Sequence, residues 1–488
     1  MSESLKSKTA KSVLWSAIER FSVQGIQFFL SIIIARLVLP SDYGMIAMVM
    51  IFLSIAQTLI DSGFSTALIQ KQDRNDEDYS TVFYFNLALG ILLYIVLYWV
   101  APFIASFYNL PVLTIVIRII GLNLIFISLS IIYRAKLTIE LDFRKQALIS
   151  LISVLISGVL GIYFAYRGWG VWALVIQSLL NNFLNSFLLW MLTSHIMLNC
   201  FSMSSFRQLF GFGSKLLLAG LLNTIYMNLY TLVIGKRYDS TALGYYNRTS
   251  TIAQLPSNNL SNIINRALFP IFCQYQNDSQ CLFSMYKKAI QLTTFCVFPL
   301  MAILLCYSDS LIFVLLGEKW IESSSILKIL CLAYIANPVM ILMVEIINVC
   351  GRSDLSLKGE YLKKLVSIIL LLSTMPFGIK IMCFGLVVYS VFDFFIMFRL
   401  LKRVLPLVTM KEHLKLLFPV FCLCCCIILV SILINNIISL PIIQLFVGLI
   451  VSMILWILIS SVCKFSEYIF IKETIVPVSY THLRAHET

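Results

Sequence analysis

The sequence predicts an all-α membrane protein of about 14 transmembrane helices. Apolar runs of about 18 to 27 residues recur from Val13 to Val462, and each is long enough to span the hydrocarbon layer of a bilayer. The composition agrees, because 60% of the 488 residues are hydrophobic, 12% are charged and the mean hydropathy is +0.93. The runs are continuously apolar rather than alternating, which favours helices over a β-barrel.

The expected helices follow one another with short polar loops between them. The first apolar run is too long for a signal peptide and lacks a small-residue cleavage site, so it is expected to be a retained span. The fourteen spans are 13 to 37, 45 to 69, 81 to 105, 112 to 133, 146 to 166, 171 to 192, 212 to 235, 249 to 274, 288 to 308, 326 to 349, 358 to 376, 381 to 398, 414 to 435 and 441 to 462.

The charge distribution predicts the orientation. With the N-terminus in the cytoplasm, most of the 36 Lys and Arg fall in cytoplasmic tails and loops, so both termini are expected inside. Basic residues beside the membrane contact anionic headgroups, which explains the net charge of +13 without a nucleic-acid partner. The cytoplasmic clusters are Arg134, Lys136, Arg144 and Lys145; Lys358, Lys363 and Lys364; and Arg399, Lys402, Arg403, Lys411 and Lys415.

The cysteines indicate neither disulfides nor a metal site. Most of the thirteen lie inside expected spans, where a thiol behaves as a small apolar side chain. Their spacing matches no metal-binding pattern, and the sequence therefore predicts no metal and no cofactor.

An internal repeat is visible at an offset of 200 residues. The offset aligns Arg36 with Lys236 and Gly44 with Gly244, and it also aligns Ala67 and Leu68 with Ala267 and Leu268. Because 200 residues correspond to six spans, an even number, the two halves share one topology and are related by an axis along the membrane normal. The repeat predicts two pseudo-symmetric six-helix lobes, 1–210 and 211–403, around a central cavity, and an additional helix pair in 404–477.

The last eleven residues, VSYTHLRAHET (478–488), break from the preceding composition. They match the in-frame translation of a common transposase-based sequencing adapter. We interpret them as an artefact, and the natural chain is expected to continue differently after Pro477.

Several motifs resemble one family of membrane proteins. They are LGYYNRTSTIAQLPSNNLSNIINRALFPIF from Leu243 to Phe272, FPLM at 298–301, LLGEKW at 315–320 and GRSDL at 351–355. Together with AIERFSVQGIQFFLSIIIARLVLPSDYG near the N-terminus, they resemble the bacterial Wzx-type lipopolysaccharide and exopolysaccharide flippases. This family belongs to the multidrug, oligosaccharidyl-lipid and polysaccharide exporter superfamily.

The resemblance implies translocation of an undecaprenyl-pyrophosphate-linked oligosaccharide from the cytoplasmic to the periplasmic leaflet by alternating access between the lobes. It also implies a location in the bacterial plasma (inner) membrane. The partners that it implies are membrane lipid, an H⁺ or Na⁺ coupling ion, a polysaccharide polymerase and a chain-length regulator.

Charged residues inside the expected spans are candidate functional groups, because a charge at the bilayer centre costs about 2.5 to 3.5 kcal/mol on insertion scales. We expect Arg20, Arg118 and Arg266, assisted by Lys215, to bind the pyrophosphate, since a guanidinium can donate two parallel hydrogen bonds to one anion. The alternatives are intramembrane ion pairs and side chains that extend to the headgroups. Arg248, near a span boundary, is open to the second of these.

Acidic residues in the spans are candidates for ion coupling. Asp61 is the first choice and Glu345 the second, because a buried unpaired carboxylate readily binds a proton. Glu19 and Asp393 also lie in expected spans. Prolines at 256, 270 and 299 are expected to kink helices or to act as hinges.

Other functions are compatible with a chain this apolar. A membrane glycosyltransferase or polymerase needs a sizeable loop with reacting groups, and neither such a loop nor an acid/base cluster is present in the sequence, so no enzymatic activity is expected. A cation-coupled multidrug extruder of the same superfamily is the nearer alternative, although the basic excess in the spans favours an anionic substrate. A non-transporting scaffold of envelope assembly is the third class.

Overall fold

The computed structural model describes residues 22–61, 63–71, 73–193 and 201–469, and they form an α-helical protein. All fourteen predicted spans fall on helices, the first of them on residues 22–37, where its described part begins. Several of the spans are built from consecutive shorter pieces. The elements are α2 (Pro40–Asp61), α3 (Phe64–Gln70), α4 (Asp76–Tyr108), α5 (Val112–Ile120), α6 (Asn123–Ile139), α7 (Phe143–Tyr166), α8 (Val171–Leu192), α9 (Met203–Met227), α10 (Leu229–Arg237), α11 (Ser240–Gln254), η1 (Leu255–Asn259), α12 (Leu260–Gln274), α13 (Ser279–Cys306), α14 (Ser308–Leu316), η2 (Glu318–Trp320), α15 (Ser323–Tyr334), α16 (Asn337–Val349), α17 (Ser353–Thr374), η3 (Met375–Phe377), α18 (Ile379–Val404), α19 (Met410–Ile437) and α20 (Pro441–Val462).

Within the described ranges, ten helical stretches are long and apolar enough to cross a membrane. Their outward faces are apolar as well. Trp99 and Phe103 of α4, for example, are 70% and 75% exposed, which is expected of side chains that contact lipid rather than water. The stretches formed by α11–α12 and by α17 are less apolar, because they carry more polar and charged residues.

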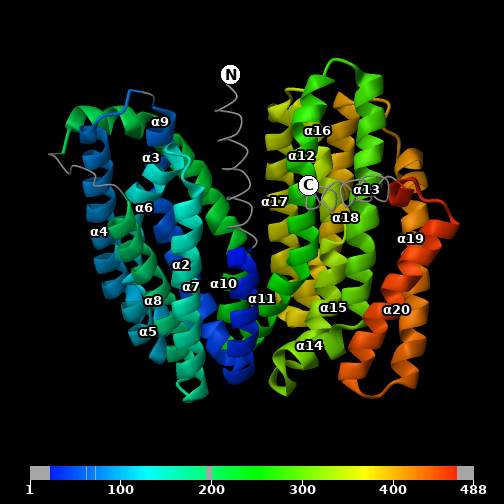
Figure 1. The fold of residues 1–488 in the computed structure, drawn as a ribbon, viewed down its shortest axis with the longest axis horizontal. Coiled ribbons are helices and arrows are strands. Elements are labelled where there is room, and N and C mark those ends of the chain that lie inside the picture. Colours follow the sequence, from blue (N-terminus) through cyan, green and yellow to red (C-terminus); the bar gives the residue numbers. More distant parts are fainter. Residues whose placement is uncertain (1–21, 62, 72, 194–200, 470–488) are drawn as a thin grey trace, which may run out of the picture. The chain divides into compact units, whose positions relative to one another are not determined.

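The chain divides into two compact units, up to Gly244 and from Tyr245 onward. Figure 1 shows each unit as a bundle of long helices. The helices α9 and α10, which cover the first span predicted for the second lobe, pack against α2 and α4 and so belong to unit 1 by their contacts. The lobe boundary at residue 210, which was inferred from the repeat and not from packing, stays a prediction.

Small residues bring the helices of unit 1 close together. A Cβ atom added to Gly90 of α4 would lie 2.8 Å from Ser128 Oγ of α6, and one added to Gly161 of α7 would lie 3.0 Å from Gln177 Cβ of α8. Membrane helices lack a strong hydrophobic driving force between them, so such close backbone approach supplies much of their packing energy. The helix α4 begins with a capping box, in which Asn75 Oδ1 accepts from the Asp78 N–H and Asp78 Oδ2 accepts from the Asn75 N–H.

Two glycines of the internal repeat meet each other in unit 1. The helices α2 and α11 begin 200 residues apart, at Pro40 and Ser240. A Cβ atom on Gly44 would clash with the Ser240 carbonyl oxygen, and one on Gly244 would clash with the Pro40 carbonyl oxygen. Each glycine therefore makes room for the backbone of the repeat-related helix start, so the residues that the offset aligns also form a reciprocal contact.

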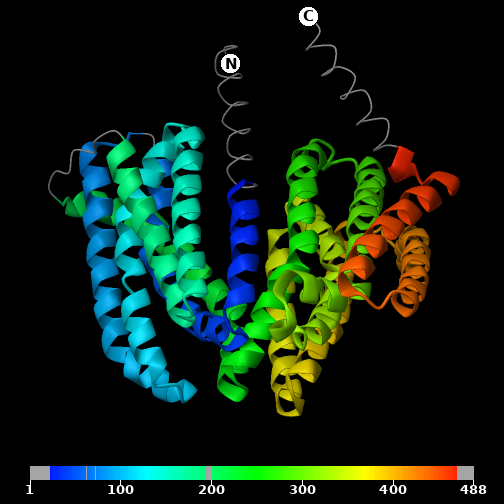
Figure 2. The ribbon, with the colours of Figure 1, turned by 60° about the horizontal axis from the view of Figure 1, so that its bottom comes forward.

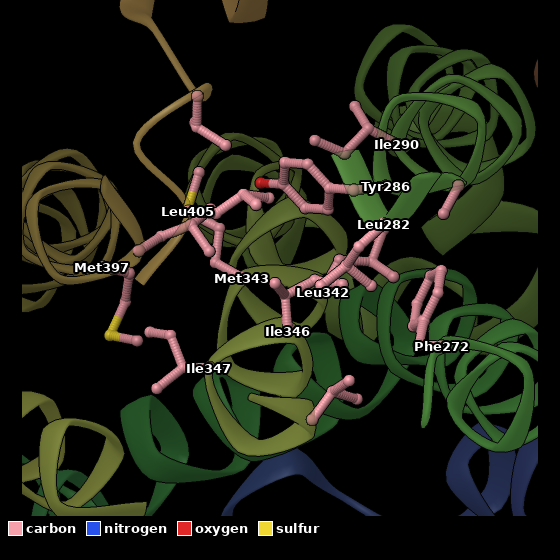
Figure 3. Packing of buried hydrophobic residues seen from close by; sticks show 14 of the residues in the cluster. Phe272, Leu282, Tyr286, Ile290, Leu342, Met343, Ile346, Ile347, Met397 and Leu405 are labelled. Atoms are coloured by element: carbon pink, nitrogen blue, oxygen red, sulfur yellow. The ribbon is translucent and has the colours of Figure 1, made fainter. Parts of the chain in front are cut away.

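Unit 2 is built around a core in which α12, α13, α16 and α18 meet. Phe272, Leu282, Leu342 and Met397 are among its buried side chains, and Figure 3 shows them pointing toward one another. Tyr286 is buried at the edge of this cluster, where its hydroxyl lies 3.0 Å from Nε2 of the buried His413 in α19. This hydrogen bond satisfies the two polar groups inside an apolar environment.

The predicted additional helix pair is α19 and α20, which Figure 2 shows in orange and red at the edge of unit 2. The pair packs on α13 and α14 through two small apolar clusters, one around Ile303, Tyr307 and Ile427 and one around Phe295 and Cys424. Gly448 of α20 leaves room for the Tyr307 ring, because a Cβ atom there would overlap it.

Because of the reciprocal glycine contact, we predict that an added methyl group destabilises the protein at Gly44 but not at Gly25. Gly44→Ala should destabilise the protein by about 1 to 3 kcal/mol, because the backbone that it meets cannot rotate away as a side chain would. Gly25→Ala is the matched control, since no atom lies within 4 Å of a Cβ at that helical position. The measurement is the thermal unfolding midpoint of each purified variant in detergent. Equal midpoints for the two variants would contradict the close approach.

Candidate functional site

The predicted anion-binding residues are only partly covered by the structure. Arg20 lies outside the described residues. Lys215 and Arg266 lie in α9 and α12, whose described backbone fixes their place in the chain but not the positions of these two side chains. Arg118 is the one member of the set whose side chain is described. The prediction that the four residues bind one pyrophosphate therefore remains a proposal.

Arg118 contacts α4 within unit 1. Its Nε donates to the Tyr98 carbonyl at 3.3 Å, and its guanidinium carbon lies 4.2 Å from the centre of the Tyr98 ring. Arg118 is the seventh residue of α5, about 9 Å along the axis from the helix start. A carbonyl and an aromatic face thus compensate part of the charge of this guanidinium without an anion.

The two predicted coupling acids occupy different environments. Asp61 is the last residue of α2 and is exposed, whereas Glu345 lies within α16 and is half-buried. Arg248, for which an interfacial position was one alternative, is 8% exposed within α11. Asp61 belongs to unit 1 and Glu345 to unit 2.

A polar cluster among the described residues lies where two helices of unit 2 are interrupted. The first interruption is the π-helix η1, which contains Pro256 between α11 and α12. Proline has no N–H to donate to the carbonyl four residues earlier, and π-helical turns occur frequently at functional sites. Pro256, which is expected to kink its helix or to act as a hinge, lies in the π-helical turn η1, whereas α12 and α13 continue as α-helices through Pro270 and Pro299.

The second interruption separates α15 from α16. Tyr334 ends α15, and the residue four positions later, which would normally donate to its carbonyl, is Pro338. Ser257 of η1 supplies a donor instead, because its Oγ donates to the Tyr334 carbonyl at 2.8 Å. Ser257 is fully buried, so this bond compensates a carbonyl that water cannot reach from that side. One hydroxyl therefore joins the breaks of two helices.

Further neutral side chains extend this contact. Gln254 Nε2 donates to the Tyr334 hydroxyl at 3.1 Å and to Ser250 Oγ at 3.0 Å, and Ser250 Oγ lies 3.2 Å from the Tyr334 hydroxyl. Asn258 Nδ2 lies 3.4 Å from Gln254 Oε1. We refer to these residues, with Ser257, as the interruption cluster. Except for Ser257 they are half-buried, so they combine hydrogen-bonding capacity with partial access.

The interruption cluster has the chemistry of a binding site rather than of a catalytic one. It contains amides and hydroxyls, which both donate and accept and therefore suit a ligand rich in hydroxyl groups. It contains no His, Cys, Asp or Glu, and no group of three such residues that could hold a metal ion occurs anywhere in the described ranges. Sequence reasoning identified Pro256 but missed Ser257 and Tyr334, although the position of Pro338 four residues after Tyr334 was an available signal.

Unit 1 has a related arrangement at the break between α9 and α10. Asn228, at that break, donates through Nδ2 to Ser54 Oγ of α2 at 3.1 Å and to the Thr224 carbonyl at 2.9 Å. One turn away, Thr58 Oγ1 of α2 lies 3.0 Å from Thr224 Oγ1. In both units, an interrupted helix is therefore joined to a neighbour through neutral side chains.

Comparison with known sequences identifies relatives. Residues 33–325 match the family described as polysaccharide biosynthesis protein. The chain is 26% identical over 371 residues to the lipopolysaccharide biosynthesis protein WzxC of Escherichia coli, covering 74% of each chain. It is 28% identical over 304 residues to the teichuronic acid biosynthesis protein TuaB of Bacillus subtilis, covering 62% of this chain and 63% of that protein. The succinoglycan biosynthesis transport protein ExoT of Rhizobium meliloti is 23% identical over 334 residues, 68% of each chain.

Comparison with solved structures identifies the fold. The lipid II flippase MurJ in an inward closed conformation superposes with a TM-score of 0.72 at 15% sequence identity, covering 92% of this chain and 98% of that one. An inward-facing multidrug transporter of the MATE family gives a TM-score of 0.60 at 13% identity, covering 80% of this chain and 98% of that one. The predicted fold class, an all-α multi-pass membrane protein, is confirmed.

The hydrogen bond between the two helix breaks can be tested by restoring the missing donor. Ser257→Ala should lower stability by about 1 to 3 kcal/mol, because it leaves the Tyr334 carbonyl uncompensated. Adding Pro338→Ala supplies a backbone N–H four residues after Tyr334, so the double variant should recover part of the loss. Ser325→Ala, which removes a hydroxyl bond within one helix, is the control. The readout is the thermal unfolding midpoint, and a double variant no more stable than the sum of the single changes would contradict the assignment.

Proposed function

We propose that this chain, which belongs to the polysaccharide biosynthesis protein family, moves an undecaprenyl-pyrophosphate-linked oligosaccharide from the cytoplasmic to the periplasmic leaflet. The chain is a multi-pass membrane transporter of the multidrug, oligosaccharidyl-lipid and polysaccharide exporter superfamily, and it has a role in polysaccharide biosynthesis. Its relatives are transporters rather than enzymes. The family match over residues 33–325 is the observation that carries the proposal.

The distribution of polar groups in this chain suits a substrate with a polar headgroup and an apolar tail. A glycan and a pyrophosphate cannot cross hydrocarbon without compensation of their polar groups. Most helices of the chain are apolar, but polar hydrogen-bonding groups are concentrated in α9–α10 and in α11–η1. A transporter that shields a polar headgroup while the prenyl chain stays in lipid needs this contrast between helices.

Two sets of residues have complementary roles in the proposal. The interruption cluster supplies neutral amides and hydroxyls for sugar hydroxyl groups. Arg20, Arg118, Arg266 and Lys215 supply positive charge for the pyrophosphate, and Arg118 exchanges its contact with the Tyr98 carbonyl for a phosphate oxygen. The paired breaks at η1 and at the α15–α16 junction act as a hinge during alternating access.

The proposed location is the bacterial inner membrane, with both termini in the cytoplasm. The basic clusters on the cytoplasmic side support this orientation. Coupling to an ion gradient through Asp61 or Glu345 is also part of the proposal. A polysaccharide polymerase and a chain-length regulator would receive the flipped substrate.

Transport by purified protein tests this proposal directly. Liposomes that contain the protein should transfer an undecaprenyl-pyrophosphate-linked oligosaccharide between leaflets, measured as its accessibility to a lectin added outside. Replacing Arg20, Arg118 and Arg266 together by Ala should reduce the rate by about tenfold or more, because charge-assisted hydrogen bonds are lost. Arg118→Lys should retain only part of the rate, since an ammonium cannot form the two-fold guanidinium contact.

The chain offers a matched control for Arg118. Arg167 also stacks on a tyrosine of its own unit, with its guanidinium carbon 5.4 Å from the Tyr163 ring centre, but it lies in an exposed turn. Arg167→Ala should leave the transfer rate unchanged. A triple variant with the wild-type rate would refute the pyrophosphate site. A wild-type protein that exports cationic drugs and transfers no lipid-linked glycan would refute the flippase assignment and support the multidrug alternative.

A further inference from the structure

Three charged side chains lie together at the interface of α17 and α18 in unit 2. Lys363 Nζ of α17 is 2.6 Å from Glu360 Oε1 on the same helix and 3.7 Å from Asp393 Oδ1 of α18. The side chains of Lys363 and Asp393 are only 12% and 9% exposed, whereas that of Glu360 is 44% exposed. Neither the family match nor the proposed substrate contacts account for this ionic network.

The network lies well inside the helices that carry it. Lys363 follows the first residue of α17 by ten positions, and Asp393 precedes the last residue of α18 by eleven, which places both about 15 Å from those helix ends. Measured from the nearer ends of the expected spans 358–376 and 381–398, each residue lies five positions, or about 7.5 Å, inside the span on its expected cytoplasmic side. Buried ionisable groups inside a span are costly unless they are paired, and they are candidates for function in a membrane protein.

Close helix packing fixes the geometry of the network. A Cβ atom on Gly359, next to Glu360, would lie 2.9 Å from Leu400 Cδ1 and 3.0 Å from Met397 Sδ of α18. The two helices therefore approach closely one turn from Lys363. Asp393 Oδ1 is inaccessible to solvent and has no hydrogen-bond partner among the described residues. Asp393 is thus a buried acid whose nearest counter-charge is engaged more closely by another carboxylate.

The charge balance of the network is one proton short of neutrality. Two ionised carboxylates and one ammonium carry a net charge of −1, and a single bound proton cancels it. We propose that Glu360, Lys363 and Asp393 form a proton-binding site in which Asp393 takes up the proton. This inference rests on the proposed function, because it assigns the step at which a proton gradient drives transport.

The surroundings favour a proton over a metal cation. The Lys363 ammonium lies 3.7 Å from the same Asp393 oxygen that a metal ion would use, and two cations at that site would repel each other. Only two carboxylates are present, and no cluster of three His, Cys, Asp or Glu occurs in the described part of the chain. A proton needs neither an additional ligand nor the departure of the ammonium.

Other titratable groups lie on α17 itself and on the helices packed against α17 and α18. On α15, Lys328 pairs with Asp309, and hydrogen bonds from Lys328 and Ser324 lower the pKa of that aspartate despite its partial burial, which acts in the opposite direction. On α16, Glu345 is half-buried, and on α17, Lys364 is half-buried beside Lys363. Asp354, at the exposed start of α17, pairs with Arg352, whose hydrogen bond lowers the pKa of that aspartate.

Protonation changes the attraction between the two helices. When Asp393 is ionised, the Lys363 ammonium attracts α18 toward α17. When Asp393 is protonated, Lys363 retains Glu360 as its ionised partner on its own helix, and the electrostatic tie between the helices is lost. The site can therefore convert the protonation state of one carboxyl into a change in helix packing.

The first experiment needs no glycan and therefore separates this site from the proposed substrate. Infrared difference spectra of the purified full-length protein, recorded across a pH titration, should show the C=O stretch of a protonated carboxylic acid. Asp393→Asn should remove that band, whereas Asp354→Asn and Glu345→Gln should retain it. Adding NaCl in place of KCl should leave the band unchanged. A band that persists in Asp393→Asn, or that Na⁺ abolishes, would overturn the proposal.

Two further variants keep the test informative if Asp393→Asn does not fold. Glu360→Gln leaves the whole Lys363 charge to Asp393, so the band should disappear at a lower pH than in the wild type. Lys363→Met removes the counter-charge, so the band should persist to a higher pH. Shifts in the opposite directions, or none, would refute the network.

The second experiment connects the site to transport. In liposomes with an imposed pH gradient, Asp393→Asn should lose the gradient-stimulated part of glycan transfer, whereas Asp354→Asn, at an exposed acid of α17, should retain it. Loss in Asp61→Asn together with retention in Asp393→Asn would overturn the coupling role and return it to Asp61. If wild-type liposomes transfer no glycan, the infrared result still decides whether Asp393 binds a proton, and only the proposed function fails.

Discussion

Hydrocarbon offers no hydrogen-bonding partner to a polypeptide, and the rest of this structure depends on that constraint. Continuous helices satisfy it by pairing each carbonyl with the N–H four residues later. A proline or a break removes one of these N–H groups and leaves a carbonyl without its helical partner. At one such position Ser257 donates to the Tyr334 carbonyl, and at the α9–α10 break Asn228 donates to Ser54 of α2. At both interruptions, a hydroxyl or amide side chain therefore joins the interrupted helix to a neighbouring one.

The same constraint explains why the sequence predicts the helices well and their contacts poorly. A span is a local property of about twenty consecutive residues, so all fourteen ranges could be located from apolarity alone. The bond from Ser257 to Tyr334 joins residues 77 positions apart and depends on how two helices are rotated. The break after Tyr334 was foreseeable from Pro338, but its partner was not. Likewise, the sequence marks Arg118 as an unusual charge without indicating that Tyr98 lies beside it.

The helices divide into two kinds with different tasks. α4, α19 and α20 are strongly apolar and present large exposed side chains, as expected of surfaces that contact lipid. α9–α10, α11–α12 and α17 carry the Asn228 contacts, the interruption cluster and the Glu360–Lys363 pair, in which the polar groups are bonded to one another. Apolar surfaces and compensated polar groups are thus found at different positions in the chain. A transporter for a substrate with a polar head and an apolar chain needs this separation, because the two parts of the substrate require different environments.

Charges within the spans are compensated in two ways that differ in their functional consequences. Arg118 is compensated by a carbonyl dipole and an aromatic face, neither of which is a counter-ion. Lys363 is compensated by two carboxylates on different helices, and their protonation can change the net charge of the site. The Arg118 guanidinium therefore stays positively charged, and an anion can compete with the Tyr98 carbonyl for its hydrogen bonds. The second arrangement couples a proton to helix packing, because an ion pair between two helices is lost when its acid is neutralised. A chain that contains both can bind an anionic headgroup with one and respond to a proton gradient with the other.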